Sequence, residues 1–387
     1  MTDKDHNPSS THPPIPPTSE DESFDRLRLL RSRRVGVATY KRLLTEHGTA
    51  QNALAALPMV ARAAGVQNYE ICSETVVHAE LRAGKAAGAR LVMHGTADYP
   101  AILAELDDAP PFLWVMGNAD LLNRPTISMV GARNASSLGT RMAKALAKGL
   151  GEAGYIVVSG LARGIDAAAH HAALGTGTIA VQAGGIDVMY PAENTQLAED
   201  IAKSGLRISE QPMGLQPMAR HFPSRNRIIA GLSRATIVVE AAAKSGSLIT
   251  ARDALDQGRD VLAVPGHPFD ARAAGCNMLI RDGAGLIRNT ADVIEALGKE
   301  CQPTSHSPQA ELNLTPAKKQ ATTQRTLRET AALHMQILSR LGPSPIAEDQ
   351  LIRDLQTAPA NVAPVLIDLE LEGQVLRQPG GLISRAG

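Results

Sequence analysis

The sequence predicts an α/β protein built around a Rossmann-like, doubly wound parallel sheet, with a small helical domain before it and a winged helix after it. Between residues 90 and 300, short apolar runs rich in Val and Ile alternate with amphipathic stretches. This pattern is typical of parallel strands that are joined by helices. Before this region the apolar residues recur at helical spacing, and after it three helical stretches precede a short hairpin pattern.

At 387 residues the chain is longer than one typical domain, and two polar segments divide it. Residues 1–22 and 301–325 are rich in Pro, Ser and Thr, which favours a disordered tail and a linker. We therefore expect a helical domain over residues 23–89, a Rossmann-like domain over 90–300 and a winged-helix domain over 326–387.

The first domain is divided into short helices by Gly36, Gly48 and Pro58. Its pattern is typical of a sterile-alpha-motif or helix-hairpin-helix domain. Two roles remain open for it: contact with DNA, or packing without a ligand of its own.

In the central domain, strands and helices alternate. The expected strands are residues 126–130, 155–159, 178–182, 206–209, 235–240 and 260–264. The expected helices are residues 140–153, 166–174, 194–204, 224–232 and 247–257, with Asp166 as an N-cap. In such a sheet, ligands bind beyond the carboxyl ends of the strands.

The last domain reads as helices over residues 333–341, 346–355 and 362–372, followed by a hairpin over residues 373–384. The third helix carries Asp368, Glu370 and Glu372 and no Lys or Arg. An acidic candidate recognition helix favours a protein contact over a DNA contact.

Composition limits the possible functions. Lys+Arg and Asp+Glu both number 39, so binding to nucleic acid has to depend on local basic clusters. Composition alone favours a protein that binds no polyanion. The three cysteines are scattered, and no apolar run approaches the roughly 20 residues that cross a bilayer. Because no signal-peptide core is seen either, we expect a cytoplasmic protein without a membrane partner.

Loops rich in Gly, Ser and Arg follow the expected strands. They read GARNASSLG, SGLARGID, AGGIDVMYPAEN, HFPSRN, AAAKSGSLITA and VPGHP. Glycines let backbone amides approach an anion, and the amino ends of helices attract negative charge. Each loop alone is weak evidence, but several loops on one edge of a sheet predict a phosphate-binding groove.

The segment 211–234 is basic and contains no Asp or Glu. Phe222 lies within it, and a ring flanked by cations suits a single strand, whose bases stack while its phosphates pair. A buried Phe222 among solvated arginines is an equally good interpretation. The basic residues of the segment are Arg220, His221, Arg225, Arg227 and Arg234.

Catalytic and cofactor patterns are missing from the sequence. It contains no GxxxxGK[ST] loop, and Ser159 is not in a GxSxG elbow. His170 and His171 are adjacent and point to different helix faces, so they are unsuited to share a metal. The first loop lacks GxGxxG. We therefore expect no cofactor, no metal and no enzymatic activity.

These motifs in this order resemble the DNA-processing protein A (DprA/Smf) family. The resemblance covers about half of the chain and is most specific in HFPSRNRIIAGLS followed by SGSLITA. It implies single-stranded DNA binding, homodimerisation through the Rossmann-like core, protection of incoming DNA and its delivery to a RecA-type recombinase in natural transformation.

The resemblance also implies a set of DNA-contacting residues. In the first loop, Ala132 and Leu138 replace a Ser and a Tyr that are frequent in the family, whereas the arginine is retained. The implied contacts are Gly131, Arg133, Ser159, Gly160, Arg163, His221, Phe222, Arg225, Asn226, Arg227, Lys244 and Ser245.

Two other readings compete with this one. The first is an enzyme of the nucleoside-monophosphate phosphoribohydrolase group, which resembles this Rossmann variant, but its PGGxGTxxE loop is absent and residues 241–250 stand in its place. The second is a scaffold whose winged helix recruits partners while the central groove is vestigial.

Overall fold

The structure is a computed structural model that describes residues 20–298, 327–341, 346–355, 357, 359–378 and 382–385. The chain forms two compact units, Met1–Thr304 and Ser305–Gly387. The tail expected over residues 1–22 and the linker expected over 301–325 lie outside the described residues, except that 20–22 begin the first helix.

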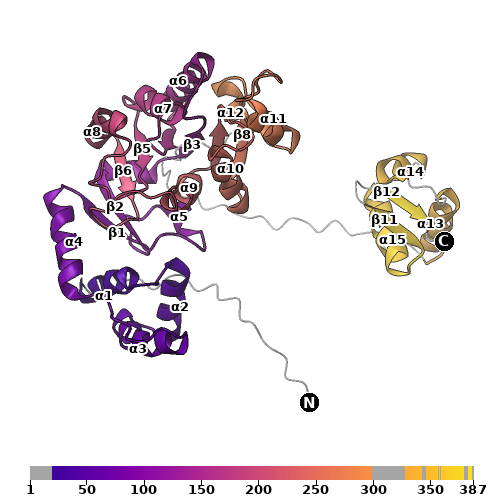
Figure 1. The fold of residues 1–387 in the computed structure, drawn as a ribbon. Helices are drawn as coiled ribbons and strands as arrows, with labels where there is room; N and C mark the ends of the chain where they lie inside the picture. Colours follow the sequence, from indigo (N-terminus) through magenta and orange to yellow (C-terminus); the bar gives the residue numbers. More distant parts are fainter. Residues whose placement is uncertain are drawn as a thin grey trace, which may run out of the picture. The chain divides into compact units, whose positions relative to one another are not determined.

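The helical part of the first unit has four helices, which enclose their own apolar cluster (Figure 1). Glu80 joins this part to the sheet: it accepts hydrogen bonds from Arg31 and, at 2.9 Å, from the indole of Trp114. A Cβ on Gly84 would lie 2.3 Å from the Trp114 ring, so a glycine is needed where α4 crosses the sheet. The helices are α1 (Glu20–Arg31), α2 (Val37–His47), α3 (Ala50–Ala63) and α4 (Glu74–Ala86).

The central sheet has nine strands in the order β1-β2-β6-β5-β4-β3-β7-β8-β9. The seven strands β6-β5-β4-β3-β7-β8-β9, in their order across the sheet, are parallel to one another. At one edge β2 pairs antiparallel with β6, and β1 pairs antiparallel with β2. The doubly wound sheet expected from the sequence is thereby confirmed. The strands are β1 (Arg90–Met93), β2 (Phe112–Gly117), β3 (Thr126–Val130), β4 (Ile156–Ser159), β5 (Thr178–Val181), β6 (Leu206–Ser209), β7 (Ala235–Val238), β8 (Asp260–Ala263) and β9 (Gly285–Leu286).

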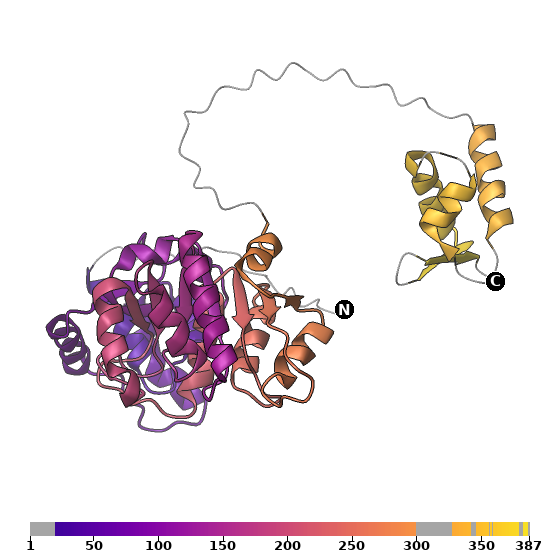
Figure 2. The same ribbon diagram turned by 90° about the horizontal axis from the view of Figure 1, so that it is seen from above.

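Helices cover both faces of this sheet (Figure 2). One apolar cluster packs α6, α7 and α12 on the sheet, and another packs α5, α9, α10 and α11 on the opposite face. Both faces of the parallel strands are therefore buried, which explains their continuous apolar sequence. The helices are α5 (Ala101–Ala104), α6 (Ser137–Glu152), α7 (Ile165–Ala173), α8 (Thr195–Ser204), α9 (His221–Gly231), α10 (Ser247–Asp256), α11 (Ala274–Arg281) and α12 (Thr290–Ala296).

The second unit contains the winged helix, with α13 (Leu327–Arg340), α14 (Glu348–Leu355) and α15 (Pro359–Leu371) beside a three-stranded sheet. Residues 346–347, expected to open a helix, instead form strand β10, which pairs with β12 (Leu382–Arg385). β12 also pairs with β11 (Val375–Gln378). None of the helices in the described part of the chain is long and apolar enough to cross a membrane.

Candidate functional site

A pocket of about 380 Å³ opens at the carboxyl edge of the parallel sheet. We call it the rim pocket. Its wall is formed by the loops that follow β3, β4 and β5 and by the start of α9, which follows β6. The sheet brings these four segments together because the carboxyl ends of parallel strands share one edge. The lining residues are Arg133, Gly160, Ala162, Arg163, Gln182, Ala183, Gly184, Val188, Met189, Tyr190, Pro191, Ala192, Glu193, Pro217, Phe222 and Arg225.

The half-buried ring of Phe222 lies close to a cation and to a second aromatic ring. The guanidinium carbon of Arg133 is 5.4 Å from the centre of the Phe222 ring, which is a cation–π distance. The centre of the Tyr190 ring lies 5.6 Å from that of the Phe222 ring. Arg133 is exposed and makes no ion pair with an acidic side chain of the described residues. The site therefore offers an apolar face beside an uncompensated positive charge.

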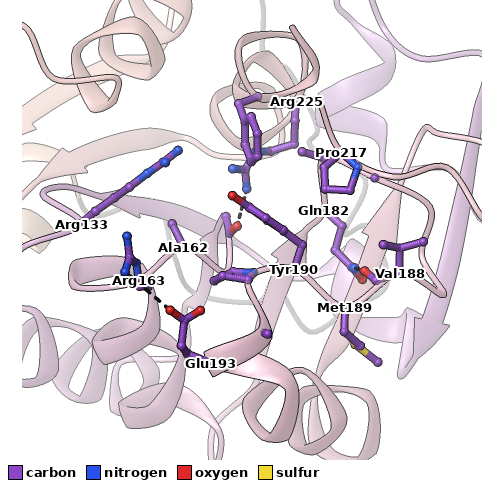
Figure 3. Close-up of a pocket in the computed structure, with 16 residues that line it drawn as sticks. Arg133, Ala162, Arg163, Gln182, Val188, Met189, Tyr190, Glu193, Pro217 and Arg225 are labelled. Carbon is purple, nitrogen blue, oxygen red and sulfur yellow. Dashed lines mark hydrogen bonds and ion pairs between the residues drawn. The ribbon is translucent and has the colours of Figure 1, made fainter. Parts of the chain in front are cut away.

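Tyr190 is the residue of this group that sequence reasoning missed. It is 49% exposed and reaches the rim pocket from the loop after β5 (Figure 3). The signal that singled out Phe222 was an aromatic residue flanked by arginines in a segment without acidic residues. Tyr190 lacks that signal, because its loop contains no arginine; the one sequence feature that could have marked it is its place in a loop after a strand in a chain with 3% aromatic residues.

Arg225 plays a different part from Arg133. It is buried, and its Nη1 donates to the carbonyl oxygens of Gly160 at 2.6 Å and Val181 at 2.7 Å. Burial lowers the pKa of Arg225 to about 10, against the opposing effect of Asp166, so the side chain is still charged at neutral pH. A Cβ on Gly160 would lie 2.0 Å from Nη1, which explains the glycine there. Arg225 thus joins the ends of β4 and β5 under the rim pocket.

Asp166 is not the N-cap that the sequence suggested. Gly164 is the N-cap of α7, with a φ of +77°, and Asp166 lies within the first turn. Its carboxylate instead accepts hydrogen bonds from the backbone amides of Gly160 at 3.1 Å and Ala162 at 3.4 Å. Burial raises the pKa of Asp166, and Arg225 and these amides counteract the rise. Asp166 and Arg225 together hold the loop after β4.

The other side of the rim pocket carries a charge pair. Arg163 is exposed and lies 3.5 Å from a carboxylate oxygen of Glu193 (Figure 3). An exposed pair of this kind exchanges readily with solvent and contributes little to stability. Gly131, in the loop with Arg133, stands where a Cβ would lie 2.6 Å from Ile165, so it permits the close approach of α7.

Besides Gly131, four of the expected contact residues do not line the rim pocket, although residues close to them in the sequence do. Ser159 is fully buried and donates its hydroxyl to the Met129 carbonyl at 2.6 Å, so it is unavailable to a ligand. Arg227 pairs with Glu210 at 2.5 Å and is largely buried. The other two are His221, which is buried at the start of α9, and Asn226, which is half-buried in the same helix.

Lys244 and Ser245 lie after β7 and are also absent from the lining of the rim pocket. Lys244 is exposed, and the Ser245 hydroxyl lies 2.6 Å from that of Ser247. The loops after β3 to β6 therefore meet at one pocket, whereas those after β7 and β8 lie further along the edge.

A Rossmann-like sheet with an aromatic, cationic pocket at its carboxyl edge defines a protein of the nucleotide- or nucleic-acid-binding class. The family model described as DNA recombination-mediator protein A matches residues 90–298, which is more than half of the chain. The chain belongs to this family, as its sequence motifs suggested, and has the family's role in DNA processing and recombination. Two further models flank this match: the DprA-like N-terminal HHH domain over residues 20–83 and the DprA winged helix domain over residues 321–381.

Individual relatives agree with this assignment. The DNA processing protein DprA of Streptococcus pneumoniae is 48% identical over 198 residues, which cover 51% of this chain and 70% of that protein. The protein Smf of a Synechocystis strain is 38% identical over 309 residues, which cover 73% of this chain and 77% of the relative.

Two solved structures resemble the model. The crystal structure of DprA from Streptococcus pneumoniae covers 70% of this chain and 96% of its own, with a TM-score of 0.60 and 36% identity. A structure of DNA processing protein A from Helicobacter pylori, described in connection with its single-stranded DNA binding mode, covers 54% of this chain and 95% of its own, with a TM-score of 0.50 and 29% identity.

Proposed function

We propose that the rim pocket binds single-stranded DNA, with one base stacked against Phe222 and Tyr190 and a phosphate beside Arg133. The observation that carries this proposal is the close approach of both the Arg133 cation and the Tyr190 ring to the Phe222 ring at the rim pocket. Every base has an aromatic face, so such a site accepts any sequence. The relative from Helicobacter pylori, whose structure is described by its single-stranded DNA binding mode, supports the same ligand.

The contact set of this proposal is narrower than the one expected from the sequence. Arg133, Arg163, Phe222 and Tyr190 face the strand. Gly160 and Arg225 shape the floor of the rim pocket. Lys244 and Ser245 contact the DNA only where the single strand continues past the rim pocket along the carboxyl edge of the sheet.

The wider role follows the family. The protein protects incoming DNA and loads a RecA-type recombinase in natural transformation, acting in the cytoplasm as a homodimer through its Rossmann-like domain. The domain boundaries at residues 23, 90, 301 and 326 are part of this proposal. Helix α15 has exposed Asp368 and Glu370, and the exposed Glu372 follows its last residue, so this end of the helix suits a protein contact better than a DNA contact.

We propose further that the protein is not an enzyme. The main alternative, a phosphoribohydrolase-like enzyme, requires a nucleotide site with a catalytic carboxylate. The one acidic side chain that lines the rim pocket, Glu193, pairs with Arg163. An exposed carboxylate in an ion pair is poorly suited to abstract or donate a proton.

The test is a pair of measurements on the purified full chain. Fluorescence anisotropy compares single-stranded with double-stranded oligonucleotides across salt concentrations, and product formation is followed with ATP and nucleoside monophosphates. We expect tighter binding of the single strand, with salt-dependent affinity, and no hydrolysis. Equal affinity for both DNA forms contradicts the strand proposal, and turnover that persists through further purification contradicts the non-enzymatic one.

A further inference from the structure

A second cavity, of about 620 Å³, lies at the point where the order of the strands reverses. The chain adds β4, β5 and β6 on one side of β3 and then β7, β8 and β9 on the other. The loops that follow β3, β7 and β8 line the cavity, which we call the switch-point cavity. In doubly wound sheets this is the place where nucleotides bind, with their phosphates at the amino end of the helix after the first strand.

In this chain that helix is α6, and a side chain occupies its amino end. Glu240 lies just beyond the end of β7. Its Oε2 accepts a hydrogen bond from the backbone amide of Ser136 at 2.8 Å, and its Oε1 accepts one from the Ser136 hydroxyl. Ser136 is the N-cap of α6, and its hydroxyl oxygen accepts in turn from the amide of Gly139 at 2.9 Å.

The backbone around Glu240 is shaped to its carboxylate. A Cβ on Gly139 would lie 2.4 Å from the carboxylate carbon, so the first turn of α6 has a glycine where the carboxylate packs against it. A Cβ on Gly131 would lie 3.0 Å from the Glu240 carbonyl oxygen. Two glycines of one loop thus accommodate this residue, in the way that glycines of nucleotide-binding loops accommodate a phosphate.

We infer that Glu240 is an internal substitute for a phosphate group and excludes nucleotides from the switch-point cavity. The amino end of a 16-residue helix attracts one anion, and the carboxylate already provides it. A second anion at the same place would meet both the volume and the charge of Glu240.

Apart from Glu240, the lining of the switch-point cavity is suited to a nucleotide. Arg141 is an exposed cation at its wall, and Leu138, Met142 and Val264 provide apolar surface. This combination suits the phosphate and the base of a nucleotide. With Glu240 in place, phosphate-bearing ligands are left with the rim pocket. The exclusion of nucleotides from the switch-point cavity does not depend on whether a DNA strand binds at the rim pocket.

The experiment uses the full chain without DNA. Melting temperatures are measured against increasing inorganic phosphate at constant ionic strength for the wild type, Glu240→Ala and Glu240→Gln. The alanine variant empties the anion position, whereas the glutamine variant loses the charge and still fills the space. We expect a saturable rise of the melting temperature with phosphate in Glu240→Ala alone, with phosphate affinity at least about tenfold above that of Glu240→Gln, a difference of about 1.4 kcal/mol.

Glu240→Ser is the milder truncation if the alanine variant does not fold. A folded truncation variant that responds to phosphate no more than the wild type would overturn the inference. Saturable phosphate binding by the wild type that is lost in Arg141→Ala would also overturn it, because the cavity would then be open to anions with Glu240 in place. In the double variant Arg133→Ala/Glu240→Ala the saturable response to phosphate should persist, because Arg133 does not line the switch-point cavity; this separates the result from the proposed strand binding.

Discussion

Phe222 contacts two neighbours of different chemistry, which favours the stacking interpretation of its sequence context over the core interpretation. A core phenylalanine would be enclosed by aliphatic side chains, but Phe222 is half-buried, with Arg133 and Tyr190 beside its ring. The ring is placed to receive a flat partner from the open side of the rim pocket.

Substitution of Phe222 by Ala should weaken single-stranded DNA binding by roughly 1–3 kcal/mol, because one base loses its stacking partner. The salt dependence should stay unchanged, since no phosphate contact is lost. Anisotropy titrations at several salt concentrations measure both. Phe269→Ala is the matched control, because Phe269 is 95% exposed in the loop after β8 and does not line the rim pocket. A Phe222→Ala protein that melts lower but binds DNA normally would contradict the stacking role.

Substitution of Arg225 by Ala should act on stability. It leaves the carbonyl groups of Gly160 and Val181 without their donor and the buried Asp166 without a compensating charge. Removing one member of a buried charged network costs about 3–5 kcal/mol, which urea denaturation can measure. The nearby exposed Arg220→Ala should change the free energy of unfolding by less than about 0.5 kcal/mol. Unchanged stability in Arg225→Ala would show that the arginine points to a ligand instead.

Among the secondary-structure elements, the strands that contain a continuous run of apolar residues could be predicted from the sequence. The strands β3 and β6 have the expected bounds, and the helices α7 and α8 each begin within one residue of the expected first residue. The strands β1 and β2 were missed, because they pair antiparallel with partners distant in the chain and lack a continuous Val/Ile run.

The candidate site was predictable in part, for a related reason. The sequence shows which residues belong to the loops, but it does not show where their side chains point. Arg133, in the loop after β3, and Arg225, in helix α9 after β6, carry the same charge, yet one is exposed at the rim pocket and the other is buried beneath it. Helix α9 turns Arg225 inward because its buried face also carries Ile228 and Ile229.

Helix α10 contains a carboxyl group that titrates near neutral pH. Burial raises the pKa of Asp253 to about 6, and Asp256 and Asp108 add to the rise. Because the folded-state pKa lies above the usual value of 3.8, the ionised form destabilises the fold, and this penalty grows as pH rises from about 4 to 6. The group is partly exposed, so solvent screening limits the penalty to about 1 kcal/mol.

Asp253→Asn should therefore be more stable than the wild type at pH 7.5 and equal to it near pH 4, as measured by urea denaturation at both values. Asp260→Asn is the control at an exposed carboxylate, and its stability relative to the wild type is measured at the same two pH values. A stabilisation of Asp253→Asn that is the same at both pH values would contradict the assignment of the titration to this residue.

At the scale of the whole molecule, formal neutrality is compatible with DNA binding because the charges are distributed unevenly. Lys+Arg and Asp+Glu are equal in number, and several arginines, such as Arg31, Arg227 and Arg288, are paired with carboxylates. Arg133 keeps its charge uncompensated at the edge where the loops meet. Binding should therefore depend on a few cations, and its salt dependence should be shallow for a DNA-binding protein.

The salt dependence of single-stranded DNA affinity in Arg133→Ala tests the strand site most directly. Arg124→Ala is the matched control: Arg124 is also exposed, but it precedes β3 and so lies at the opposite edge of the sheet. We predict that Arg133→Ala weakens binding and lowers the slope of log affinity against log salt by about 0.7, the value for one lost phosphate contact on a single strand. Arg124→Ala should bind like the wild type. Equal slopes in all three proteins would contradict a strand bound at the rim pocket.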